Sequence, residues 1–153
     1  MPTRYKGRAR DVRALDVFIK LMRASETLTA RLNRGLAGTD VTPGQLSVLE
    51  ALLHVGPMSQ SELGKKLLRS NANMTTVLDN LERDGLIRRE RESDDRRVVT
   101  VSLTADGKRR IEKVFPAHAA RIAESLAALS ASEQEKLGEL CKKLGCAIAG
   151  QEE

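Results

Sequence analysis

The residues of this sequence best suited to recognising another molecule lie between Ser70 and Leu81. Apolar residues recur there at helical spacing, which predicts an amphipathic helix with one buried stripe. The opposite face carries short polar side chains whose donors and acceptors match base edges and phosphate oxygens. Asparagine can pair with adenine through two hydrogen bonds, and a threonine methyl group can pack on thymine. The candidate reading residues are Ser70, Asn71, Asn73, Thr75, Thr76 and Asn80.

The two ends of this helix have local signals. Ser70 is the expected N-cap, because its hydroxyl can accept a hydrogen bond from the first turn. Gly85 is the expected stop, with a positive φ after the last helical residue. Asp79 shares the polar face but is anionic, so we expect it to form a salt bridge with Arg83 rather than to meet a phosphate.

A charged segment that follows Gly85 supplies the second group of candidate residues. Leu86 and Ile87 open a short strand, and an alternating segment at 99–103 predicts a returning strand. The intervening run, residues 88–97, is almost wholly charged and cannot be buried. Its arginines are candidates for the sugar-phosphate backbone: Arg88, Arg89, Arg91 and Arg96, with Arg97 at the end of the run. The four acids of the same run permit another interpretation, a surface salt-bridge network of little energetic value.

A helix followed by an arginine-tipped hairpin is the reading half of a winged helix-turn-helix. At these residues the sequence resembles the MarR family of bacterial transcription regulators. Asp95-Arg96-Arg97, then five residues, then Leu103-Thr104 and Gly107 match the family's DxR…LTxxG pattern. Weaker similarity extends over residues 12–144.

The resemblance implies specific roles and partners. Arg97 would enter the minor groove, where a narrow A·T tract has the most negative potential, and Asp95 would brace the wing. The family binds double-stranded DNA as an obligate homodimer. It responds to a small ligand, often a phenolic or other aromatic anion, or to thiol oxidation. The ligand pocket would be lined by the first helix, the helix after Thr42 and the helix after Thr104.

Capping boxes position the remaining helices. They lie at Thr42–Gln45, Ser59–Glu62 and Ser130–Glu133, and Thr104 is expected to cap a further helix. The segment 59–84 then forms a helix-turn-helix whose second helix enters the major groove. Basic residues just before that helix are candidates for phosphate contacts, although a solvated face would explain them too: Lys65, Lys66 and Arg69.

The two ends of the chain predict a dimerisation region. Residues 11–37 form one helix with two apolar stripes, and residues 105–149 form helices with more apolar surface than one small domain can bury. The predicted fold is therefore mainly α with a small β wing, in which residues 42–104 are the DNA-binding domain. Residues 1–10 form a basic arm that either contacts DNA or is a solvated tail.

Composition favours a polyanionic partner and argues against several other classes. The net charge is +5 and the pI is near 9.5. Three aromatic residues are too few for stacking on single-stranded nucleic acid. Nothing resembles a catalytic motif, a signal peptide or a membrane span, so we expect a cytoplasmic non-enzyme without a cofactor. His54 and His118 lack neighbouring ligands and are interpreted as structural or surface residues, not as a metal site.

The sequence and its resemblance together predict a regulator, most simply a repressor, that reads a pseudo-palindromic operator. The resemblance implies that a small aromatic ligand releases it. Two alternatives stay open. One is a thiol-based redox regulator that uses Cys141 and Cys146, although Cys141 falls on an apolar stripe typical of a core position. The other is a winged helix without sequence preference, either an architectural DNA-binding protein or a module for protein contacts.

Overall fold

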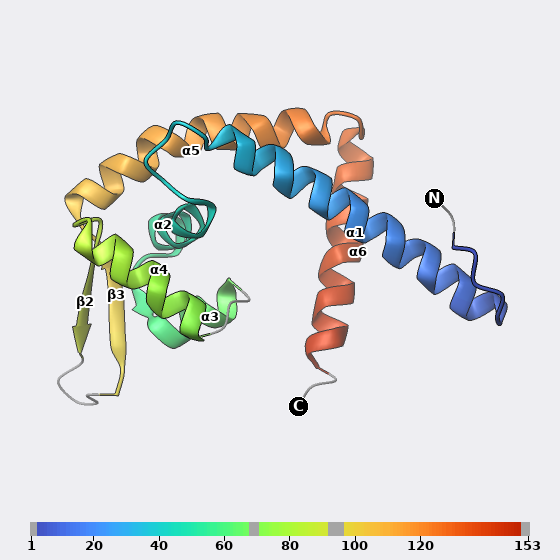
Figure 1. Cartoon of the computed structure of the whole chain (residues 1–153), viewed down its shortest axis with the longest axis horizontal. Helices are drawn as coiled ribbons and strands as arrows, with labels where there is room; N and C mark the ends of the chain where they lie inside the picture. The colour runs from blue at the N-terminus through green and yellow to red at the C-terminus, as the bar shows by residue number, and fades with distance from the viewer. Residues whose placement is uncertain (1–2, 68–70, 92–96, 151–153) are drawn as a thin grey trace. The chain divides into compact units, whose positions relative to one another are not determined.

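The computed structural model describes residues 3–67, 71–91 and 97–150, which form helices and one small sheet (Figure 1). The elements are α1 (Ala9–Gly35), α2 (Pro43–Val55), β1 (Met58–Ser59), α3 (Gln60–Lys66), α4 (Asn71–Arg83), β2 (Ile87–Arg91), β3 (Val99–Leu103), α5 (Ala105–Leu126) and α6 (Ala131–Ala149). The chain divides into two units, Met1–His118 and Ala119–Glu153. The mainly helical fold with a β wing agrees with the prediction.

The three predicted capping boxes lie at the starts of their helices. The Oγ1 atom of Thr42 accepts a hydrogen bond from the backbone N–H of Gln45 at 3.2 Å, and Ser59 and Ser130 accept equivalent bonds at the starts of α3 and α6. In each of the three boxes the side chain at the third helical position also bonds back to the N-cap. These bonds satisfy amide groups that would otherwise lack a partner in the first turn.

The sheet has three antiparallel strands in the order β1-β3-β2. Arg89 of β2 lies opposite Val101 of β3, and Met58 of β1 lies on the other side of the same residue. The sequence predicted only β2 and β3, because the two residues of β1 have no periodicity of their own. β2 also continues to Arg91, so the charged run is partly a strand rather than wholly a loop.

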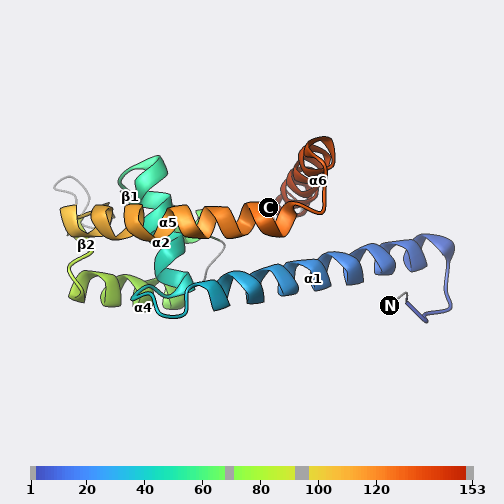
Figure 2. The same ribbon diagram turned by 90° about the horizontal axis from the view of Figure 1, so that it is seen from above.

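The core of the first unit lies between α2, α3, α4, the sheet and the start of α5. Seen from above, α2 crosses between α4 and the first part of α5 (Figure 2). The largest fully buried side chains of this core are Val48, Leu49, Leu63, Met74, Leu78, Leu81, Val101 and Ile111. Burial of eight such side chains, each stabilising by about 1.5–3 kcal/mol, fixes the lobe that carries α4 and the wing.

A turn and a close contact join α4 to the strand and helix that follow. Gly85 has a φ of +72°, and the N–H of Leu86 donates to the carbonyl of Leu81 at 2.9 Å, as in a Schellman motif. Thr104 caps α5 by accepting from the N–H of Gly107 at 3.0 Å, and its hydroxyl donates to the carbonyl of Gly85 at 2.7 Å. A Cβ at Gly107 would collide with the carbonyl oxygen of Leu86. The threonine and glycine of the family pattern thus hold the wing root against the end of α4.

α1 and α6 contain no buried residues. Their exposed large apolar side chains are Leu15, Val17, Phe18 and Met22 on α1 and Leu137, Leu140, Leu144 and Ile148 on α6. Cys141 is exposed as well, so its interpretation as a core residue is wrong for this chain, since α6 has no core to enter. No helix in the described part of the chain has the length and apolar character needed to cross a membrane.

Candidate nucleic-acid interface

The exposed face of α4 carries the predicted reading residues. Met74, Leu78 and Leu81 are completely buried and fix the rotation of the helix about its axis. Asn73, Thr75 and Thr76 are therefore exposed, and Asn80 is half-buried. Short polar side chains on a rotationally fixed helix meet the geometric requirement for direct readout in a major groove.

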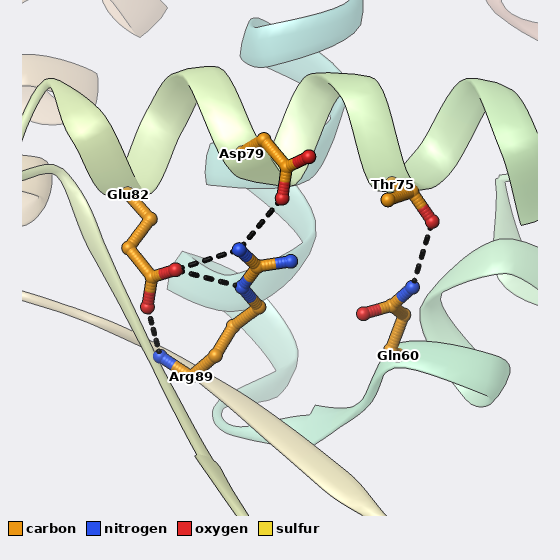
Figure 3. Close-up of polar contacts among 5 residues, drawn as sticks. All are labelled: Gln60, Thr75, Asp79, Glu82 and Arg89. Carbon is orange, nitrogen blue, oxygen red and sulfur yellow. Dashed lines mark hydrogen bonds and ion pairs between the residues drawn. The ribbon is translucent and has the colours of Figure 1, made fainter.

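Gln60, the first residue of α3, extends this polar face toward the sheet. Its Nε2 donates to the Oγ1 of Thr75 at 3.2 Å and so joins α3 to the middle of α4 (Figure 3). Sequence reasoning did not single out Gln60. The feature that could have identified it is its position directly after the Ser59 N-cap, at the start of the helix that precedes the reading helix.

Arg89 of β2 connects the wing to α4 through two carboxylates (Figure 3). Its Nε and Nη2 donate to Oε2 of Glu82 at 2.9 and 2.7 Å, and Nη2 also donates to Oδ1 of Asp79 at 2.7 Å. The backbone N–H of Arg89 donates to Oε1 of Glu82 at 3.0 Å. One glutamate thus holds both the side chain and the main chain of β2, which fixes the strand against the helix.

The electrostatics of this cluster, Arg89–Glu82–Asp79, favour the charged forms. The hydrogen bond from Arg89, supported by its backbone N–H and its charge, lowers the pKa of the Glu82 carboxyl, although partial burial acts in the opposite direction. The same bond to Glu82 raises the pKa of Arg89. The Glu82 side chain is 38% exposed and that of Asp79 is 56% exposed, so the bond from Arg89 to Glu82 is the better shielded of the two.

The predicted Asp79–Arg83 salt bridge is wrong. Asp79 pairs with Arg89, and Arg83 pairs with the neighbouring Asp84 at 3.4 Å. Asp79 and Glu82 are three residues apart on one helix face, and that face meets β2. The spacing of the two acids indicates that one cation could bind both of them. The identity of that cation, Arg89, follows only from the register of β2 in the sheet.

The other wing arginines of the described chain are exposed. Arg88 is 65% exposed and makes one ion pair within its own strand, to Glu90 at 3.0 Å. Arg91, the last residue of β2, and Arg97 are exposed as well. Arg97 lines a cavity of about 370 Å³ together with Ser59, Gln60 and Ser61. The wing, the start of α3 and the exposed face of α4 are therefore neighbours.

Two further predicted contacts, Lys65 and Lys66, are exposed on the last turn of α3. Several predictions fall outside the described residues: those for Arg69, Ser70, Asp95 and Arg96, and that for the side chain of Asn71. No cluster of three or more His, Cys, Asp or Glu side chains in the described ranges could hold a metal ion.

Comparisons with known proteins agree with this geometry. Residues 41–99 match the sequence model of the MarR family. An uncharacterized HTH-type transcriptional regulator, YkoM of Bacillus subtilis, is 35% identical over 133 residues, which cover 87% of this chain and 86% of that protein.

Two solved structures are similar over most of their length. A mutant MarR from E. coli complexed with operator DNA has a TM-score of 0.75 and 26% identity, and the match covers 84% of this chain and 92% of that one. Bordetella bronchiseptica BpsR, whose DNA binding is regulated by 6-hydroxynicotinic acid, has a TM-score of 0.77 and 26% identity over 84% and 98% of the two chains.

Proposed function

Since the chain belongs to the MarR family of DNA-binding transcriptional regulators, we propose that it binds a pseudo-palindromic operator as a homodimer and represses transcription until a small aromatic ligand releases it. The family consists of regulators, so the chain is not an enzyme. The observation that carries the proposal is the continuous face formed by the start of α3, the exposed side of α4 and the wing.

Each part of that face has a proposed role. Asn73, Thr75, Thr76 and Asn80 read base edges in the major groove. Arg97 enters the adjacent minor groove, and Arg88 and Arg91 neutralise phosphates together with Lys65 and Lys66. We assign Arg89 to positioning the wing, because its guanidinium is bonded to both Glu82 and Asp79 of α4.

A second copy of the chain is the proposed partner of α1 and α6. Eight large apolar side chains on these helices are exposed in the single chain, four on each helix, and exposed apolar surface of this kind marks an association interface. α1, α6 and the later part of α5 would then form the dimerisation region. Two reading helices about 34–36 Å apart would meet successive major grooves on one side of the duplex.

The small-ligand response is proposed by analogy with BpsR, whose DNA binding is regulated by a small aromatic acid. A second candidate is a redox switch at Cys141 and Cys146, whose thiols are both exposed in the single chain. To separate the redox switch from the ligand response, operator binding is measured after peroxide treatment of wild type and of the double variant Cys141→Ser, Cys146→Ser. Loss of operator binding in wild type but not in the variant supports the redox switch, and equal behaviour rules it out.

The central experiment measures operator affinity by fluorescence anisotropy for wild type, Arg97→Ala and the control Lys136→Ala on α6. We expect Arg97→Ala to weaken binding at least tenfold, whereas Lys136→Ala binds as wild type does. Random-sequence competitor DNA tests specificity. The logarithm of affinity should fall with the logarithm of salt concentration by about 0.9 per phosphate neutralised. Unchanged affinity in Arg97→Ala, or a flat salt response, would refute the proposal.

A further inference from the structure

Gln60 is held at a fixed place beside the reading helix. It is the first residue of α3, and the preceding Ser59 caps that helix. The Oγ of Ser59 accepts from the backbone N–H of Glu62 at 3.2 Å, and the Glu62 carboxylate accepts from the backbone N–H of Ser59 at 2.8 Å. Leu63, three residues after Gln60, is completely buried in the core. The cap and this buried side chain fix the rotation of α3, so the Gln60 amide meets α4 at a defined position.

The Gln60 amide contacts one side chain on the exposed side of α4. Its Nε2 donates to the Oγ1 of Thr75 at 3.2 Å (Figure 3). A helical threonine has two common χ1 rotamers, which point its hydroxyl and its methyl group in different directions. The bond from Gln60 stabilises the rotamer that turns Oγ1 toward α3, and the methyl branch of the same carbon then points elsewhere. Because Thr75 is an exposed residue, this methyl group is available on the exposed side of α4.

The orientation of Thr75 decides which base it can recognise. A hydroxyl group both donates and accepts hydrogen bonds, so it can pair with the major-groove edge of more than one base. A methyl group packs on the C5-methyl of thymine, which no other base carries in the major groove. A threonine whose hydroxyl is held by its own protein therefore favours thymine, whereas one that changes rotamer freely favours no single base.

We propose that Gln60 is a positioning residue for sequence recognition: it holds the Thr75 hydroxyl toward α3, so that the Thr75 methyl group packs on one thymine in each half-site. The inference rests on the proposed function, in which Thr75 lies in the major groove. It adds the identity of the recognised base and the residue that fixes the choice. Gln60 acts through Thr75 and reads no base itself.

The test uses the full-length protein and an operator that wild type selects from random-sequence DNA. Each thymine is replaced in turn, in both half-sites, by deoxyuridine, which removes only the C5-methyl group, and fluorescence anisotropy measures the affinity for each duplex. We expect at least one thymine at which the replacement weakens wild-type binding about fourfold per half-site, the ratio that corresponds to one buried methyl-sized group of about 0.8 kcal/mol. At that thymine the ratio should fall below about twofold in Gln60→Ala, because the methyl group is then divided between two rotamers.

Two substitutions of Thr75 assign the effect to this pair of residues. Thr75→Ser removes the methyl group and should abolish the thymine preference at the same position. Thr75→Val has methyl groups on both branches of Cβ, so the preference should persist, and adding Gln60→Ala should leave it unchanged. The matched control is Ser61→Ala on the next residue of α3, which lines the same cavity as Gln60 and should keep the wild-type ratio. Thermal unfolding checks that each variant folds.

Gln60 also lines the cavity beside Arg97, so the competing role is a direct contact with the DNA backbone. In that case Gln60→Ala weakens binding to every duplex by the same factor and keeps the thymine ratio, which overturns the inference. A ratio that still falls when Gln60→Ala is added to Thr75→Val overturns it as well. Failure to select any operator refutes the proposed function and this inference with it, whereas a selected operator without a Gln60-dependent thymine refutes this inference alone.

Discussion

Arg89→Met separates an arginine that holds the wing from one that contacts DNA. Methionine keeps an unbranched stem of similar length but removes three charged hydrogen bonds, two to Glu82 and one to Asp79. The backbone bond from residue 89 to Glu82 can persist. The matched control is Arg88→Met on the preceding residue of β2, which removes an exposed ion pair with Glu90.

The magnitude follows from exposure. Hydrogen bonds to charged groups contribute about 1.5–3 kcal/mol when shielded, and exposed ion pairs about 0.2–1 kcal/mol. Glu82 is 38% exposed and Asp79 is 56% exposed, so both contributions are reduced by solvent screening. We expect Arg89→Met to lower the free energy of unfolding by about 2 kcal/mol, which is about 4–8 °C in Tm for a chain of this length. Arg88→Met should change it by less than about 0.5 kcal/mol.

The assay pairs thermal unfolding at fixed protein concentration with operator affinity over a range of salt concentrations. Arg88→Met should reduce the salt slope by about 0.9 per protomer, because a phosphate contact is lost. Arg89→Met should weaken binding through a displaced wing while the slope stays that of wild type. If Arg89→Met instead unfolds like wild type and reduces the slope as Arg88→Met does, Arg89 is a phosphate contact and the assignment is wrong.

Three further predictions test other parts of the fold. Glu82→Gln should lower the free energy of unfolding at pH 7. This difference from wild type should disappear as the pH falls through the lowered pKa of Glu82, which lies below the value of about 4.3 in unfolded chains. A difference in urea unfolding that stays constant down to pH 3 would contradict this. Gly107→Ala should lower the free energy of unfolding by about 3 kcal/mol because its Cβ meets the carbonyl of Leu86, whereas Gly138→Ala, with open space around its Cβ, should be neutral or stabilising by up to about 1 kcal/mol. Leu144→Glu should shift sedimentation equilibrium toward monomer while Arg88→Met does not, and an unchanged dimer would remove α6 from the interface.

The three capping boxes, the turn at Gly85 and the buried side of α4 were predicted correctly from the sequence. Each capping box lies within one helical turn, so its residues act independently of the rest of the fold. The same holds for Gly85, because its positive φ and the bond from Leu86 to Leu81 need only six consecutive residues. The periodic apolar residues of α4 predicted its buried side for the same reason.

Features that depend on distant pairing could not be predicted. β1 exists because Met58 pairs with Val101, more than forty residues later, and a two-residue strand carries no pattern. The partner of Asp79 depends on how β2 lies against α4, and sequence distance favoured Arg83 instead. The exposure of Cys141 has a related cause: a heptad-like stripe shows that α6 needs a partner surface but does not say that the surface belongs to this chain.

The apolar side of α6 has a consequence for how the protein responds to its own abundance. A helix of nineteen residues that contains no buried residue gains little stability from its own chain, so packing against another molecule would stabilise it. If that molecule is a second copy and most chains are monomeric, halving the concentration of the chain reduces the concentration of dimer about fourfold by mass action. Gene dosage alone would then set a threshold for control, before any chemical signal arrives.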